Sequence, residues 1–439
     1  MRSIKILNNY KKNKFIRNVI TLASGTAAAQ GINMLFSPII TRIYGPEAFG
    51  ILGVFVSIIS IVTPIVALTY PVAIVLPKSD SEAKRLIRLS LYISLAMSVI
   101  VYLILSLFEV TIIKMLQIDS ITPFLLFIPI VMLCLASQQV ATQWLLRKKQ
   151  FGLTAKIVVA QSLIVNSSKL SLGLLYPISA TLILVTSIGM GIHAVMLSIG
   201  ARITKTNQEQ EIDTSLNKNQ KPPLLMLAKK YCDFPLYRGP QEFLAALSQS
   251  MPILLLTYLF GPAVAGFYTL GKSILGLPSQ LIGKAVGDVF YPRIAEASHS
   301  NEKITKLLRK ATTTLAAVGL FPFGVIIMFG PVLFSFVFGS EWEIAGEYAR
   351  WIALWSYALF VSKPCINTIP IISAQKFHLY YTFVNIIFRA IALILGGFVF
   401  NNDIIAVALF GLTGAFFSVL LIIFTLNKSE KFDRGSFVI

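Results

Sequence analysis

Long apolar segments follow one another along almost the whole chain, and charge clusters or Gly and Pro residues separate them. A helix of about 20 apolar residues crosses the hydrocarbon core of a bilayer, and segments of this length recur twelve times. The pattern therefore predicts an all-α polytopic membrane protein with about twelve transmembrane helices. These segments lie at roughly 18–41, 49–76, 86–108, 121–145, 155–176, 178–201, 234–260, 263–290, 311–337, 348–372, 378–400 and 404–426.

The composition agrees with this reading. Hydrophobic residues make up 56% of the 439 residues and charged residues 13%, whereas an ordinary soluble domain has about 25% charged residues. The mean hydropathy is +0.76. Twelve spans require about 240 apolar positions, which is close to the whole hydrophobic content of the chain. A soluble enzyme with a single membrane anchor is therefore excluded.

The positive charges orient the chain in the membrane. Lys and Arg number 38 and Asp and Glu number 19, which gives a net charge of +19. If the amino terminus lies inside, about 29 of the cations fall in inside segments, and only Arg42, Lys114 and Arg350 fall outside. The positive-inside rule thus predicts that both termini are cytoplasmic. The excess of cations follows from topology, so it does not indicate a nucleic-acid partner.

Two short motifs recur in the second half of the chain. Gly45-Pro46-x-x-x-Gly50 returns as Gly261-Pro262-x-x-x-Gly266. The pattern from Glu82 to Arg88 returns from Glu302 to Arg309, at nearly the same offset. An offset of about half the chain predicts two six-helix lobes in the same orientation. The predicted divisions are an amino-terminal lobe at 1–203, a flexible cytoplasmic linker loop at 204–230 and a carboxyl-terminal lobe at 231–439.

Several predicted spans carry polar residues at helical spacing. Each such stripe faces something other than lipid. Hydrogen bonds between helices explain any one of these residues, but stripes in so many helices favour a shared, water-filled cavity. The candidate cavity residues are Gln30, Asn33, Asn166, Gln280, Asn367 and Asn385.

Six cations fall within predicted spans, where a charge facing lipid is costly. Arg238 has Glu242 four residues later, and Lys284 has Asp288, so ion pairing or snorkelling explains these two as well as function does. The other four have no acidic partner within their spans, and an anionic cargo would supply the missing counter-charge. The candidate substrate-binding cations are Lys272, Lys363, Arg389, Lys169, Arg238 and Lys284.

No catalytic motif is visible in the sequence. It contains no His and acid pair, no nucleophile motif, no phosphate-binding loop and no metal-ligand spacing. The three cysteines, Cys134, Cys232 and Cys365, are too scattered for a disulfide framework or a zinc site. The sequence therefore predicts a protein that is not an enzyme and that needs no cofactor or metal.

Several stretches resemble a known family. Thr41-Arg42-Ile43-Tyr44-Gly45-Pro46-Glu47-Ala48-Phe49-Gly50 is similar to the opening signature of bacterial polysaccharide-unit flippases, the Wzx type of O-antigen and capsule exporters. A second set of stretches is similar to the seventh and eighth helices of that family: Phe234-Pro235-Leu236-Tyr237, Ser248 to Leu256, Phe260-Gly261-Pro262 through Gly266-Phe267-Tyr268, and Val289-Phe290-Tyr291-Pro292. The resemblance implies the multidrug/oligosaccharidyl-lipid/polysaccharide exporter fold, in which two six-helix lobes enclose a central cavity that opens alternately to either side.

The same resemblance implies a substrate and a location. The cargo would be an oligosaccharide repeat unit on undecaprenyl diphosphate, turned from the cytoplasmic to the outer leaflet of the bacterial inner membrane among its lipids. A polysaccharide polymerase and chain-length proteins become candidate partners. The first alternative is an ion-coupled drug antiporter of the same fold, which would be expected to hold buried carboxylates. The second, a multispanning glycosyltransferase or polymerase, would be expected to have a large outside loop.

Overall fold

The computed structural model describes residues 14–77, 79–116, 121–208, 223–276, 302–372 and 374–434, together with 290 and 294. Within these ranges all regular secondary structure is helical. Many large apolar side chains on the helices are exposed, among them Leu35, Leu107 and Phe336, each more than three-quarters exposed. Such outward-facing apolar surface is what a bilayer would cover. The protein is accordingly an all-α polytopic membrane protein.

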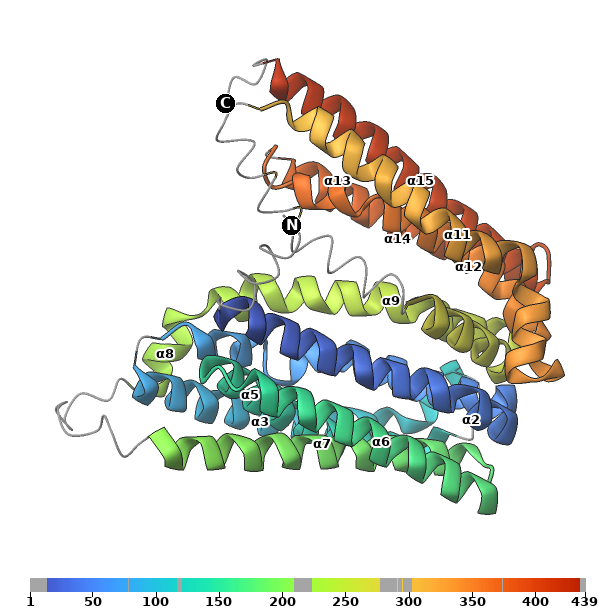
Figure 1. The fold of residues 1–439 in the computed structure, drawn as a ribbon. Helices are drawn as coiled ribbons and strands as arrows, with labels where there is room; N and C mark the ends of the chain where they lie inside the picture. Colours follow the sequence, from blue (N-terminus) through green and yellow to red (C-terminus); the bar gives the residue numbers. More distant parts are fainter. Residues whose placement is uncertain are drawn as a thin grey trace, which may run out of the picture. The chain divides into compact units, whose positions relative to one another are not determined.

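The chain divides into two compact units. The first comprises residues up to Tyr44 and Ile51–Met251. In Figure 1 its helices α5, α6 and α7 run side by side, and α3 packs on α5. Its elements are α2 (Lys14–Val66), η1 (Tyr70–Val75), α3 (Asp80–Leu116), α4 (Thr122–Leu125), α5 (Ile128–Arg147), α6 (Phe151–Leu175), α7 (Ser179–Gln208), α8 (Leu224–Lys230), the π-helix η3 (Phe234–Arg238) and the start of α9 (Gly239–Phe260).

The second unit comprises Gly45–Gly50 and Pro252–Ile439. Helix α12 packs on both α11 and α15, and α14 packs on α15. Its elements are the end of α9, a helix over residues 262–276, α11 (Ile304–Phe338), η4 (Ser340–Trp342), α12 (Glu343–Val361), α13 (Lys363–Thr368), α14 (Gln375–Phe398) and α15 (Asp403–Asp433). The predicted boundaries of the two lobes remain a prediction.

Each of the twelve predicted segments is mainly helical over its described residues. The first two are joined in α2, which kinks at Gly45, where φ is 70° and ψ is 173°. Nine helices of the described ranges are long and apolar enough to cross a membrane. Residues 277–289 of the eighth predicted segment lie outside the described residues.

In two predicted spans the first helix ends well before the predicted bound. The second was expected to continue to residue 76, but α2 ends at Val66 and the backbone turns through left-handed Leu68 and Thr69 into η1. The tenth was expected to continue to residue 372, but α12 ends at Val361 before α13 begins. In both places a proline follows closely, Pro71 and Pro364. Proline has no N–H to bond the carbonyl four residues earlier, and its ring clashes with that carbonyl, so the preceding helix cannot continue regularly.

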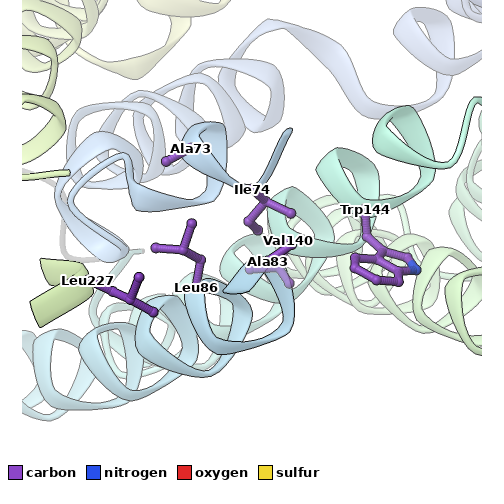
Figure 2. Close-up of a cluster of buried hydrophobic side chains, with 7 residues drawn as sticks. All are labelled: Ala73, Ile74, Ala83, Leu86, Val140, Trp144 and Leu227. Atoms are coloured by element: carbon purple, nitrogen blue, oxygen red, sulfur yellow. The ribbon is translucent and has the colours of Figure 1, made fainter. Parts of the chain in front are cut away.

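Helices extend into both ends of the predicted linker segment. Helix α7 continues to Gln208, and α8 forms before α9 begins. Leu227 of α8 is 1% exposed and joins a buried cluster with η1, α3 and α5, shown in Figure 2. The Tyr70 hydroxyl donates a hydrogen bond to the Ala228 carbonyl over 3.0 Å, and Lys230 pairs with Glu82. This hydrogen bond to Glu82 raises the pKa of Lys230. The carboxyl-terminal end of this segment is thus packed within the first unit.

The two Gly-Pro motifs lie against each other within the second unit. A side chain at Gly50 would place its Cβ 1.7 Å from the Pro262 carbonyl oxygen, and one at Gly266 would lie 1.9 Å from that of Pro46. Gly45 and Gly261, which precede the prolines, both have positive φ. Each motif therefore uses one glycine for a backbone turn and the other for close backbone approach. The sequence repeat is matched by a repeat in structure.

Candidate functional site

In the first unit, polar residues of α2 and α6 form a hydrogen-bonded network. The side-chain Oδ1 of Asn33 accepts a hydrogen bond from the Ser162 hydroxyl over 2.9 Å and one from the side-chain amide of Asn166 over 2.6 Å. Ser162 also donates to the Ala29 carbonyl over 3.1 Å. The network brings together two predicted cavity residues, Asn33 and Asn166. Part of its role is structural, since each bond joins or stiffens the two helices.

Lys169 lies one turn beyond Asn166 on α6 and is half-buried. The Tyr44 hydroxyl donates to the Lys169 backbone carbonyl over 2.8 Å, and the Tyr44 ring packs where Gly173 has no side chain. No ion pair with a carboxylate of the described residues neutralises the Lys169 ammonium. The α2–α6 contact therefore fixes the backbone that carries this cation and leaves its charge for another partner.

In the second unit, Arg389 of α14 is 7% exposed. Its guanidinium carbon lies 3.7 Å from the ring centroid of Trp355 on α12 and 3.7 Å from that of Phe410 on α15. The two rings are nearly perpendicular, with an interplanar angle of 77° and centroids 5.7 Å apart. The cation therefore sits in the corner of an aromatic pair, where cation–π attraction stabilises it.

Glycine makes room for this corner. A Cβ at Gly414 of α15 would lie 2.6 Å from the Trp355 ring, and one at Gly411 would lie 2.5 Å from the Trp351 carbonyl oxygen. Helices α12 and α15 can therefore approach closely enough to bring Trp355 beside Phe410. Tyr268 extends the aromatic surface, because its ring meets Phe410 edge-to-face with centroids 6.2 Å apart.

The remaining candidates have different surroundings. Lys272 interacts electrostatically with Arg389, so the second unit holds two cations near one another. Lys363 and Asn367 are half-buried on α13. Asn385 lies one turn before Arg389, and its side-chain oxygen is buried. Gln30 is half-buried on α2.

Arg238 and Glu242 form the predicted ion pair, with an N–O distance of 2.8 Å, and both side chains are largely exposed. Arg238 is thus explained by pairing, as the spacing suggested. Lys284 and Gln280 lie outside the described residues.

The arrangement presents cations and side-chain amides, groups whose chemistry suits an anion. Within the described part of the chain no cluster of His, Cys, Asp or Glu could hold a metal ion. Sequence reasoning found the cations but missed the aromatic rings around Arg389. Trp355 and Phe410 stand 34 and 21 positions from Arg389, in other helices, so no spacing rule relates them.

The chain matches a family described as "Polysaccharide biosynthesis protein" over residues 39–346. No curated protein sequence matches it. Among solved structures it is similar to an inward-facing multidrug resistance MATE family transporter of the MOP superfamily, with a TM-score of 0.70, 12% identity and coverage of 92% of this chain and 96% of the other. It is also similar to the lipid II flippase MurJ in its inward closed conformation, with a TM-score of 0.69, 12% identity and coverage of 93% and 87%.

A third similar structure is a MOP superfamily transporter from Pyrococcus furiosus, whose binding pocket is described as having reverse polarity. Its TM-score is 0.62 at 12% identity, with coverage of 95% of this chain and 96% of the other. At these identities the similarity shows the fold, and the match over residues 39–346 shows the family. The chain belongs to the polysaccharide biosynthesis protein family and has the fold of the MOP-superfamily transporters.

Proposed function

We propose that the protein is a flippase that moves an undecaprenyl-diphosphate-linked oligosaccharide repeat unit from the cytoplasmic to the outer leaflet of the bacterial inner membrane. The family supports a role in polysaccharide assembly, and the fold supports transport. The observation that carries the proposal is the set of cations in predicted membrane spans that have no carboxylate partner in the described residues, namely Lys169, Lys363 and Arg389. A polysaccharide polymerase and chain-length proteins are the partners that this role would require.

The cargo would provide the charge that these cations lack. A charged side chain at the centre of a bilayer costs about 2.5 to 3.5 kcal/mol on insertion scales, so unpaired cations are retained there for a functional reason. A diphosphate carries at least two negative charges. Lys169 on α6 offers an ammonium group to an anion in the first unit, and Lys363 on α13 does so in the second. The polar network of Asn33 and Asn166 lies one to two turns from Lys169 and offers hydrogen bonds to sugar hydroxyls.

An ion-coupled drug antiporter of the same fold is the alternative. A transporter of organic cations requires carboxylates to attract its substrate, and intramembrane cations would repel that substrate. Glu242, the acid well inside a predicted span, already forms an ion pair with Arg238. The electrostatics of the described residues therefore favour an anionic cargo.

Replacing Lys169 and Lys363 by glutamine is expected to stop transport without unfolding the protein. Removing a desolvated charge does not weaken folding, but it removes the attraction for the diphosphate. In a polysaccharide-producing strain that depends on this protein, each single variant should lower surface polysaccharide several-fold and the double variant at least tenfold. The lipid-linked unit should accumulate on the cytoplasmic side. Arginine at either position should retain more export than glutamine.

Lys310→Gln is the matched control, because Lys310 is exposed near the start of α11 and lies outside the candidate set. It removes the same charge and should leave export unchanged. Full export by a well-folded Lys169→Gln, Lys363→Gln double variant would reject the anionic cargo. Improved efflux of organic cations by that variant would favour the antiporter.

We further propose that both termini and the central linker face the cytoplasm, while the two Gly-Pro turns face outward. Single cysteines at Glu47, Ala263 and Asn217, in a protein whose three native cysteines have been replaced, would report this. A membrane-impermeant thiol reagent added to intact cells should label positions 47 and 263 and leave position 217 unlabelled until the cells are opened. Labelling of position 217 in intact cells would reverse the orientation.

A further inference from the structure

The guanidinium of Arg389 has hydrogen-bond donors that nothing in the described residues satisfies. Its Nε and Nη2 atoms are both buried, and neither has a hydrogen-bond partner there. These two nitrogens carry the N–H bonds that point in parallel along one edge of the guanidinium. That edge forms bidentate contacts with carboxylates and phosphates in proteins.

The aromatic corner does not replace those contacts. The rings of Trp355 and Phe410, each 3.7 Å from the guanidinium carbon, attract the positive charge. They provide no oxygen for the N–H groups, and a buried donor without an acceptor destabilises the state in which it occurs. The rings therefore fix the position of the guanidinium and leave one edge for an acceptor.

Two neighbours point to the same ligand chemistry. Lys272 adds a second positive charge close to Arg389. The side-chain oxygen of Asn385, one turn earlier on α14, is buried without a partner among the described residues. Oxygen and nitrogen of an Asn amide are exchanged by a rotation of its end group, so the same position can present an N–H donor. Two cations and an amide, with no carboxylate paired to Arg389 in the described chain, form a site for an oxyanion.

We propose that Arg389 recognises an oxyanion of the cargo through its Nε and Nη2 edge, with Lys272 and Asn385 beside it. This rests on the proposed function and adds to it a specific two-oxygen contact within the second unit. Two groups share the required chemistry, a phosphate of the lipid diphosphate and the carboxylate of an acidic sugar. Lysine cannot reproduce a bidentate contact, so Arg389 acts through geometry as well as charge.

Binding to the purified full-length protein tests the site. The probes are inorganic pyrophosphate, a disaccharide containing glucuronic acid and the matching neutral disaccharide. The decisive variant is Arg389→Lys, which keeps the charge and loses the two-donor edge. Binding of at least one anionic probe is expected to weaken tenfold or more. Arg350→Lys on α12 is the control and should bind as the wild type does, because its Nη atoms already contact Glu347 and the Met328 carbonyl.

Asn385→Asp provides a second variant in case Arg389→Lys does not fold. It places a carboxylate one helical turn from Arg389, where it would occupy the free edge as an internal counter-ion. Thermal stability should rise and binding of the anionic probe should fall tenfold or more. A purely structural Arg389, satisfied by its aromatic rings, predicts unchanged binding in both variants.

The two probes identify the source of the oxyanion. A selective loss of pyrophosphate binding assigns the site to the diphosphate, and a selective loss of the acidic disaccharide assigns it to a sugar carboxylate. Wild-type affinity for both probes in Arg389→Lys, or in Asn385→Asp where the first does not fold, would overturn the inference. So would an absence of anion binding by the wild type. The export assay changes only Lys169 and Lys363 and leaves Arg389 intact. It therefore tests the proposed function independently of the Arg389 site.

Discussion

Alanine at Gly50 is expected to prevent the second unit from folding stably. The added Cβ would lie 1.7 Å from the Pro262 carbonyl oxygen and 2.5 Å from its carbon. Both are backbone atoms, so no side chain can rotate away to relieve the overlap. Adding a methyl group to a well-packed site costs about 1 to 3 kcal/mol where the surroundings relax, and a backbone obstacle places this variant at or above the upper end.

Gly266→Ala provides an independent test of the same contact, because its Cβ would lie 1.9 Å from the Pro46 carbonyl oxygen. Each variant should lower the amount of monodisperse protein recovered from membranes and its unfolding temperature. Gly31→Ala is the matched control on α2, since nothing lies within 4 Å of its added Cβ. The control should be neutral or slightly stabilising, because alanine favours helix by about 1 kcal/mol over glycine. Wild-type stability of Gly50→Ala would show that the two motifs are not in close contact.

The structure of these two motifs could be predicted from the sequence only in part. Their recurrence was visible as a repeat, and proline after glycine predicts a break in helical backbone. That the two copies would pack on each other could not be inferred, because such a contact depends on tertiary arrangement. Hydropathy located the membrane helices for a physical reason, since lipid requires about 20 apolar residues in each. Hydropathy did not predict the helix ends at Val66 and Val361, because the apolar sequence continues past both of them.

Part of the candidate site could also be predicted from the requirement of lipid for apolar residues. A cation in an apolar segment is conspicuous whatever the fold, so Lys169 and Arg389 could be selected without a structure. The Asn33 and Asn166 contact was anticipated only as polar stripes, since helical spacing gives the face of a helix but not its neighbour. The sequence did not identify Trp355 as a site residue, because aromatic residues are common in apolar helices. Its role depends on Gly414, whose missing side chain admits the ring.

Arg147, at the end of α5, is expected to be the most sensitive residue on the polar surface of the first unit. Its side chain is 11% exposed and pairs with Asp80 at the start of α3, with an Nη2 to Oδ1 distance of 2.9 Å. It also donates to the Pro77 carbonyl over 2.6 Å and to the Ile74 carbonyl over 3.3 Å. One guanidinium thus holds η1, the following turn and α3 together.

Arg147→Met keeps much of the side-chain volume and removes every one of these donors. The Ile74 and Pro77 carbonyls each lose a hydrogen bond, and Asp80 keeps Lys148 as a partner, so we expect a loss of about 2 to 3 kcal/mol in unfolding free energy. Lys149→Met, at an exposed neighbouring position, should change stability by less than about 0.5 kcal/mol. Arg147→Lys should fall between, because an ammonium cannot reach the carboxylate and both carbonyls in one plane. Equal thermal unfolding of Arg147→Met and Lys149→Met would show that η1 is held by its apolar cluster alone.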